Sequence, residues 1–339
     1  MKDRILSAAR ALGALALARR LTGGSLRILG YHGLWIGEGR PYGNTLFMPV
    51  DLFARRMRWL ARSGYPVLDL PEAAERLEQG TLPKGATVIT IDDGWRSIHS
   101  HMLPILEELG LPSTLYAATY YVERQTVVTN IAIACAVDRT TLITADLSDM
   151  LPALVGPLTF DSPAARRASL HALNGAVDAL PSAGERAAAA FAIGDRLAVP
   201  LEPFGDQFTY MSPEELADAQ LRGMRVELHT HRHRGLSGGV DFLGAEIEDN
   251  RTSLARSCRG PFDHFCYPGG EYHAGADAIL RDKGIATATT TLRGLNPPGT
   301  DPLHLRRFLD SFAISQVEFE TYMAGGFEPI DRRRRLVPT

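Results

Sequence analysis

The sequence predicts an α/β fold built from parallel strand–helix–strand units, and three observations support this prediction. Short runs of β-branched and apolar residues, such as residues 88–91, are typical of buried strands. Segments with apolar residues at helical spacing, such as residues 49–62, end near glycines that favour helix termination. The two kinds of segment alternate along the chain, which indicates parallel βαβ units.

Length and composition indicate an ordinary globular protein. The 339 residues are enough for one large α/β domain or two smaller ones, and 45% of them are hydrophobic and 22% charged. The net charge of −3 argues against nucleic acid as a partner. The three cysteines are too few for a disulfide framework and fit a reducing compartment.

Residues 1–24 raise the question of membrane targeting. Their Ala- and Leu-rich stretch is interrupted by Arg10, Arg19 and Arg20, which fits neither a signal peptide nor a membrane span. The apolar residues fall at helical spacing, so we expect an amphipathic helix that packs on the domain. Peripheral contact with the inner face of a membrane is the alternative. We accordingly expect a cytoplasmic protein.

Two adjacent carboxylates follow the apolar run of residues 88–91. Asp92 and Asp93 would lie at the carboxyl end of a strand, where parallel α/β folds place their chemistry. Neighbouring buried carboxylates repel each other unless a cation or a shared proton compensates. The simpler alternative is a solvated Asp-Gly turn between a strand and a helix.

Three of the ten histidines lie within residues 229–233. His229 and His233 are four residues apart and would share a face on one helical turn, whereas His231 would point elsewhere. Two imidazoles and one carboxylate form a three-ligand metal site that leaves positions open for water and substrate. A basic surface turn is the alternative, because short histidine clusters are weak motifs.

A third segment, residues 265–270, reads Phe-Cys-Tyr-Pro-Gly-Gly. With Thr-Ile-Asp-Asp-Gly at residues 90–94 and His-Thr-His-Arg-His at residues 229–233, it resembles the three motifs of the polysaccharide deacetylases of the NodB-homology type, also called carbohydrate esterase family 4. The resemblance spans residues 26–325. It implies a (β/α) barrel that is incomplete and has about seven strands.

The resemblance also implies an activity, namely metal-dependent removal of an N-acetyl or N-acyl group from a sugar or glycan. Asp93, His229 and His233 would bind a divalent ion, with zinc preferred and cobalt, manganese, iron or nickel as alternatives. Asp92 would act as general base toward the attacking water.

Two further roles follow from the family's mechanism. A backbone N–H in the turn that contains Tyr267, Pro268 and Gly269 would stabilise the oxyanion. The leaving amine needs a proton, and His32 matches a Tyr-His segment found in members whose motif order looks circularly permuted, the poly-N-acetylglucosamine deacetylases among them. We therefore predict His32 as the general acid, with His304 in reserve.

One family feature has no counterpart in residues 265–270. The third motif of the family usually supplies an arginine that pairs with the catalytic base, and this segment contains none. Arg306 or Arg307 would have to supply it from elsewhere in the chain.

The chain divides into three predicted parts. These are an N-terminal helix (residues 1–24), a catalytic domain (residues 25–325) and a basic, solvated tail (residues 326–339). Within the domain, residues 123–208 depart from the strand–helix rhythm and are predicted as a helical insertion over the catalytic face. The insertion is either a lid or acceptor-binding cap, or a set of spacer helices.

Other functions remain open at the level of sequence. A deformylase or an O-deacetylase acting on a lipid-linked or nucleotide-linked sugar would use the same residues. A carbohydrate-binding protein on an inactive deacetylase fold is the non-enzyme alternative. The sequence does not decide the sugar, its linkage, the metal or the oligomeric state.

Overall fold

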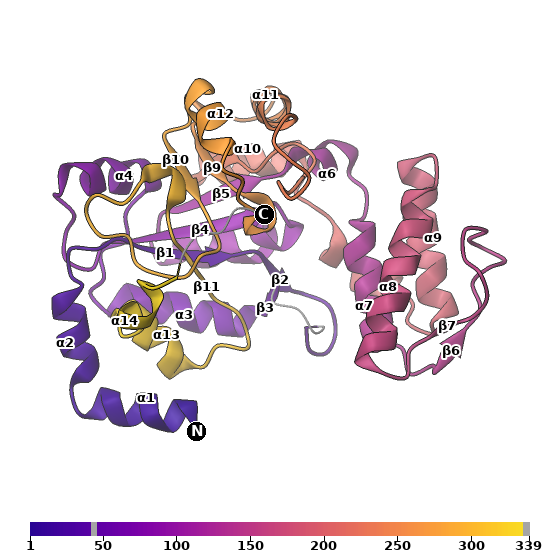
Figure 1. The fold of residues 1–339 in the computed structure, drawn as a ribbon, viewed down its shortest axis with the longest axis horizontal. Helices are drawn as coiled ribbons and strands as arrows, with labels where there is room; N and C mark the ends of the chain where they lie inside the picture. Colours follow the sequence, from indigo (N-terminus) through magenta and orange to yellow (C-terminus); the bar gives the residue numbers. More distant parts are fainter. Residues whose placement is uncertain (42–45, 335–339) are drawn as a thin grey trace.

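The computed structural model describes residues 1–41 and 46–334. Its centre is a curled sheet of seven parallel strands that forms a half-barrel with helices around it (Figure 1). The strands lie in the order β10-β9-β8-β5-β4-β1-β11, so the predicted fold class is confirmed. The seven strands are β1 (Arg27–Tyr31), β4 (Thr87–Asp93), β5 (Ser113–Ala117), β8 (Met224–Leu228), β9 (His264–Cys266), β10 (Thr287–Thr289) and β11 (Phe308–Leu309).

The two edges of the sheet are joined just before β11. Thr289 and Leu305 form an isolated parallel bridge. The Leu305 N–H donates to the carbonyl of Ala288 at 2.9 Å, and the Thr290 N–H donates to the carbonyl of Leu305 at 2.9 Å. The chain entering β11 is thereby held against β10, although these strands are at opposite ends of the sheet order.

Helices follow most of the strands and bury one face each, because their apolar residues recur at helical spacing. Helix α3, for example, buries Phe53, Met57 and Leu60. The helices around the sheet are α3 (Val50–Arg62), α4 (Leu70–Gln79), α5 (Leu103–Glu108), α10 (Pro213–Leu221), α11 (Leu243–Leu254), α12 (Ala276–Asp282) and α13 (Gln316–Met323). A π-helical turn (Ile98–Met102) precedes α5, and a short strand pair, β2 (Gly33–Trp35) with β3 (Phe47–Pro49), follows β1.

Alternation along β4 divides the core into two clusters. Val88 packs with Ile28 and Tyr116 in the smaller cluster. Ile89 and Ile91 belong to the larger cluster, which includes the side chains of the surrounding helices. Successive side chains of a strand point to opposite faces, so residues 88, 90 and 92 share the face of the smaller cluster.

The N-terminal residues form two helices, α1 (Lys2–Ala11) and α2 (Ala14–Leu21), where one amphipathic helix was expected. Gly13 separates them with a left-handed φ of 79°, which glycine adopts without a steric penalty. Helix α1 lies against α13, where Lys2 pairs with Glu318 and Arg10 with Glu320. Among the described residues, no helix combines the length and apolar character that a membrane span requires.

The insertion forms a lobe at one side of the barrel, to the right in Figure 1. The sequence predicts helices over residues 163–180 and 183–197, and two helices begin at these positions. Helix α7 and a small hairpin were not predicted. The elements of this region are α6 (Thr119–Arg124), α7 (Thr129–Arg139), β6 (Thr144–Ala145), β7 (Leu158–Thr159), α8 (Pro163–Asp178), α9 (Ala183–Arg196) and a 3-10 segment (Glu202–Phe208).

The C-terminal segment is folded further than predicted. Helix α14 (Glu328–Asp331) ends at a buried carboxylate that pairs with Arg293 at 2.9 Å. Arg332 pairs with Glu328 and Arg334 with Asp331. Helix α14 was not predicted, whereas residues 332–334 after it are exposed. Arg335 lies outside the described residues.

Candidate functional site

Strand β4 delivers Asp92 and Asp93 to its carboxyl end, and both carboxylates are buried. Asp92 continues the strand face of Val88 and Thr90. Asp93 has a positive φ of 77°, which is uncommon for a residue other than glycine. The change of backbone direction gives the two neighbouring carboxylates different partners.

The histidines lie in a loop that follows β8, and the helical turn predicted from their spacing is wrong. Thr230 and His233 have φ values of 60° and 55°, which are incompatible with an α-helix. The loop nevertheless brings His229 and His233 together, with ring centroids 4.9 Å apart. The predicted convergence is therefore present, although a curled loop produces it.

Asp93, His229 and His233 converge as predicted. Asp93 Oδ1 lies 3.4 Å from His229 Nε2 and 3.2 Å from His233 Nε2. One ligand atom of each residue lies within 4.8 Å of the ligand atoms of the other two. The other oxygen, Asp93 Oδ2, accepts the indole N–H of Trp95 at 2.7 Å. This set of one carboxylate and two imidazoles fits a divalent cation with open positions.

A network of hydrogen bonds fixes the position of His229. Its Nδ1 donates to the carbonyl of Cys266 at 2.8 Å, which leaves Nε2 free to act as a ligand. The His229 backbone N–H donates to Asn250 Oδ1 at 2.9 Å, and Asn250 Nδ2 donates to the carbonyl of Ala117 at 3.0 Å. The ligand is therefore positioned before any ion binds.

The electrostatics of the three groups reflect their contact. Burial raises the pKa of Asp93, but hydrogen bonds to His229 and His233 outweigh burial and hold this pKa well below its usual range. Burial lowers the pKa of His229, but the neighbouring Cys266 and Asp93 outweigh burial and raise this pKa well above its usual range. The opposite shifts of these two pKa values show that Asp93 favours a positive charge beside it.

Asp92 has a separate partner, Arg307. The guanidinium donates two bonds, Nη1 to Oδ1 at 2.7 Å and Nη2 to Oδ2 at 2.8 Å, and both side chains are buried. Burial raises the pKa of Asp92, but Arg307 outweighs burial and leaves this pKa below its usual value. Of the two arginines that the sequence left open, the structure brings Arg307 to the carboxylate, and Arg306 instead donates to the carbonyl of Asp331 at 2.8 Å.

His32 lies beside Asp92, in the connection between β1 and β2. Its Nε2 is 3.8 Å from Asp92 Oδ2, and its side chain is partly exposed to the same cavity. Cys266 also contacts this carboxylate, with its Sγ 3.6 Å from Oδ2. The predicted acid and the predicted base are therefore neighbours, and His32 is not part of the group formed by Asp93, His229 and His233.

The turn after β9 offers one backbone donor to the cavity. The Tyr267 N–H donates to Thr289 O at 3.1 Å, and the Gly270 N–H donates to Tyr267 O at 2.9 Å. Pro268 has no N–H and is not among the residues that line the cavity. The Gly269 N–H has no partner among the described residues, and Gly269 lines the cavity with a φ of 64°. Of the predicted oxyanion group, Gly269 is thus the remaining backbone donor.

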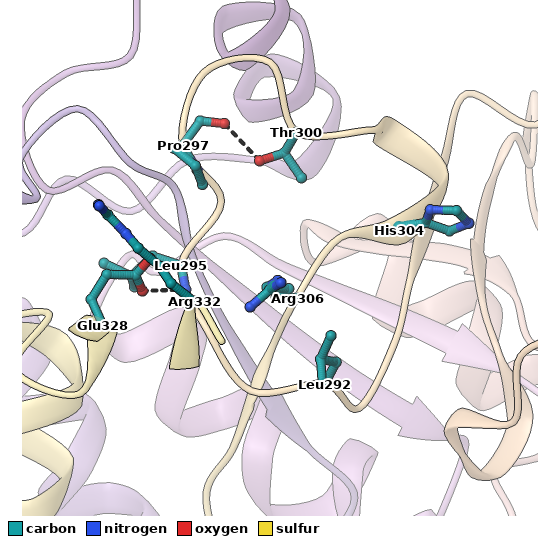
Figure 2. A pocket seen from close by; sticks show the side chains of 8 residues that line it. All are labelled: Leu292, Leu295, Pro297, Thr300, His304, Arg306, Glu328 and Arg332. Atoms are coloured by element: carbon teal, nitrogen blue, oxygen red, sulfur yellow. Dashed lines mark hydrogen bonds and ion pairs between the residues drawn. The ribbon is translucent and has the colours of Figure 1, made fainter. Parts of the chain in front are cut away.

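His304 lies elsewhere, so its prediction as a reserve acid is wrong in geometry. It pairs with Asp277 at 3.1 Å and with Asp301 at 3.7 Å. It lines a different pocket, at whose margin Figure 2 shows it, apart from Glu328 and Arg332. His304 ends the short 3-10 segment Pro302–His304 and does not line the cavity that contains Asp92.

His231 points away from the cluster, as the sequence predicts. Its Nδ1 shares a hydrogen bond of 2.8 Å with Thr119 Oγ1, and its carbonyl accepts the N–H of Tyr120 at 2.8 Å. His231 therefore ties the histidine loop to the start of α6.

One cavity of about 540 Å³ is lined by the two carboxylates, His32, His229, His233 and the turn residues Tyr267 and Gly269. Its barrel side carries Asp92, Asp93, His32 and the two clustered histidines. The insertion supplies another side, through residues that the sequence did not single out: Thr129, Asn130, Ile131, Asn174 and Asp178. No motif marks these residues, because they gain a role only when the helices are packed beside the barrel.

Comparisons with known proteins agree with the motifs. The sequence model of the family described as "Polysaccharide deacetylase" matches residues 157–288. The curated Bacillus subtilis (strain 168) protein named "Putative polysaccharide deacetylase YxkH" is 34% identical over 92 residues, which are 27% of this chain and 31% of that protein. The matched region is thus less than a third of this relative's length.

Solved structures show the same fold. The deacetylase PplD of Streptococcus pyogenes, solved in complex with acetate, has a TM-score of 0.58 at 16% identity, over 88% of this chain and 98% of PplD. IcaB from Ammonifex degensii has a TM-score of 0.56 at 18% identity, over 88% of this chain and 97% of IcaB. The family match, the curated relative and the shared fold together confirm the resemblance of this chain to the polysaccharide deacetylase family.

Proposed function

We propose that this protein is a metal-dependent hydrolase that removes an N-acetyl or N-acyl group from a sugar or glycan. The observation that carries the proposal is the separation of two roles at adjacent positions. Asp93 faces two imidazoles, and Asp92 faces an arginine instead, with contacts of 2.7 and 2.8 Å. A cation site and a free carboxylate beside it are the parts that amide hydrolysis by water requires.

Asp93, His229 and His233 would hold the cation. When bound there, a divalent cation supplies Lewis acidity toward the acyl carbonyl and makes a nearby water more acidic. Zinc is our first choice for a set of two imidazoles and one carboxylate, and cobalt, manganese, iron and nickel are the alternatives.

Asp92 would accept the proton of the attacking water. A general base must be ionised at the working pH, and Arg307 keeps Asp92 ionised although it is buried. The bidentate contact also fixes the direction of the carboxylate. Arg307 therefore positions the base from a site more than two hundred residues further along the chain.

The other two groups would act on the products of this attack. The Gly269 N–H is oriented by a left-handed turn and would donate to the oxyanion. His32, 3.8 Å from Asp92, would donate a proton to the departing amine nitrogen when the C–N bond breaks. The two products are then a carboxylate and an amino sugar.

Several facts support a sugar amide as the substrate. The family match is to polysaccharide deacetylases, and the structure of similar fold from Streptococcus pyogenes was solved in complex with acetate. An O-deacetylase or a deformylase would use the same residues, and these remain the alternatives. A carbohydrate-binding protein without turnover does not need a carboxylate beside the cation site.

The test measures acetate release and metal content on the same samples. Purified protein is supplied with zinc, cobalt or manganese and incubated with N-acetylated oligosaccharides, O-acetylated sugars and N-formylated sugars. We expect acetate from the N-acetylated substrates. The Asp92→Asn variant should lose at least ~100-fold in rate and keep its metal. Equal activity of this variant, or release from O-acetyl substrates alone, would contradict the proposal.

A further inference from the structure

The wall that the insertion contributes to the cavity has its own chemistry. It consists of residues at the start of α7 and at the end of α8, whereas the reacting groups come from strand ends and loops of the barrel. Asn174 and Asp178 are four residues apart on α8, so they lie on one face of this helix. Asn130 of α7 lines the same cavity.

The polar groups of this wall are unpaired. Among the described residues, Asn130, Asn174 and Asp178 make no side-chain hydrogen bond or ion pair with the protein. Asn130 and Asp178 are exposed and solvated, whereas Asn174 is half-buried. Asn174 Oδ1 is also fully buried. A buried acceptor without a partner costs about 1–3 kcal/mol, and native proteins rarely retain one unless a ligand or water completes the bond. The wall therefore presents acceptors and donors that a bound molecule would satisfy.

An aromatic ring lies next to these polar groups. Tyr121 of α6 lines the cavity and packs against Tyr210. Asp178 lines the same cavity as Tyr121. A ring beside amide and carboxylate groups suits a sugar, which has apolar C–H faces and hydroxyl groups at its edges.

The charge of the wall restricts which sugar fits. None of the cavity-lining residues of the insertion is a cation. Arg186 of α9 lies nearby, but its guanidinium donates to the carbonyl of Leu180 at 2.7 Å, and the residue does not line the cavity. Arg232 of the histidine loop lines the same cavity, but its guanidinium pairs with Glu246 and Asp249 at 2.8 Å each. A nucleoside-diphosphate group placed at this wall would face the Asp178 carboxylate, which disfavours such a ligand.

On the basis of the proposed deacetylase function, we propose that Asn130, Asn174 and Asp178 form a subsite for a second, neutral sugar unit. The substrate is then an N-acylated oligosaccharide of at least two units, and not a nucleotide-linked monosaccharide. The cavity volume of about 540 Å³ lies within the usual range for ligand sites and exceeds the needs of an acetyl group alone. The insertion thereby acts as the acceptor-binding wall of the site.

Binding by the full chain tests the subsite without turnover. Protein stripped of metal with a chelator is titrated calorimetrically with a pentasaccharide of N-acetylglucosamine and with the monosaccharide. We expect Asn174→Ala and Asp178→Ala each to weaken pentasaccharide binding at least ~10-fold and to leave monosaccharide binding unchanged. The matched control is Asp195→Ala, which removes an exposed carboxylate of α9 that does not line the cavity. It should bind both sugars like the unmodified protein.

The results separate this inference from the proposed function. Unchanged pentasaccharide affinity in both variants, no binding by the unmodified protein, or tighter binding of a nucleoside-diphosphate-linked N-acetyl sugar would each overturn the subsite. Acetate release from the metal-loaded protein is measured in parallel. If acetate is released but the pentasaccharide affinity is unchanged in the Asn174 and Asp178 variants, the subsite proposal is wrong and the deacetylase proposal stands. If the oligosaccharide binds through these residues but no acetate appears, the deacetylase assignment fails alone.

Discussion

Replacing Arg307 with methionine tests the link between the buried ion pair and the reacting base. Methionine fills much of the same volume but leaves Asp92 without its two charge-assisted bonds of 2.7 and 2.8 Å. Arg307 is 0% exposed and Asp92 is 2% exposed, so water does not replace the lost partner. Removing one partner of a buried pair costs about 3–5 kcal/mol, and we expect this loss in the free energy of unfolding at pH 7.5.

The loss should depend on pH in a defined direction. In the unmodified protein, the pKa of Asp92 is lowered by Arg307, so its contribution to stability is present above the unfolded pKa and is lost as pH falls through the folded pKa. Without Arg307, burial raises the pKa of Asp92, and the carboxyl binds a proton more readily as pH falls. The stability difference between the two proteins should therefore shrink from pH 8 toward pH 5.

Urea denaturation followed by tryptophan fluorescence measures this difference, because the chain contains 3 tryptophans. Arg306→Met is the matched control, since its guanidinium contacts the carbonyl oxygens of Asp331 and Arg334 and no carboxylate of the site. The double variant Asp92→Asn with Arg307→Met should recover part of the loss, because it removes both charges. A loss below ~1 kcal/mol for Arg307→Met, or one that does not change with pH, would refute the reasoning.

Two further predictions concern the metal ligands. Trp95→Phe removes the indole N–H that fixes Asp93 Oδ2, so we expect ~10–100-fold weaker zinc binding in competition with a chromogenic chelator. Trp59→Phe, in α3 against Phe319, should bind zinc normally, and equal affinity in both variants would contradict this role. Because the pKa of His229 is well above its usual range in the ion-free protein, zinc binding at pH 7 should release protons and weaken as pH falls. Calorimetry in buffers of different ionisation enthalpy measures the release, and a buffer-independent enthalpy would exclude it.

The sequence predicts most of the fold, because its β-branched runs and helical periodicities agree with the final elements. Helix α3 ends at the predicted residue 62 and begins one residue after the predicted start. The N-terminal region differs, since Gly13 allows a break that periodicity does not reveal. The small hairpin of the insertion leaves no comparable pattern, because its strands have two residues each.

The candidate site is predictable where adjacent residues form a motif. Asp92, Asp93 and the two histidines converge as the motifs indicate, although the turn of the histidine loop depends on two left-handed residues that no pattern marks. Arg307 is predictable only as one of two neighbours, because strand alternation decides which of them faces the barrel interior. The prediction of His304 as a reserve acid is wrong because it rested on sequence position alone, and this residue does not line the cavity.

The cation site itself is the central claim, and metal titration tests it most directly. Zinc or cobalt is titrated into metal-free protein and into His229→Ala and Asp93→Ala variants, with His231→Ala as the control, since His231 bonds to Thr119 instead. The account predicts one tightly bound ion per chain in the unmodified and control proteins, and at least ~100-fold weaker binding in the two ligand variants. Absence of stoichiometric binding in the unmodified protein, or full binding by the ligand variants, would contradict it.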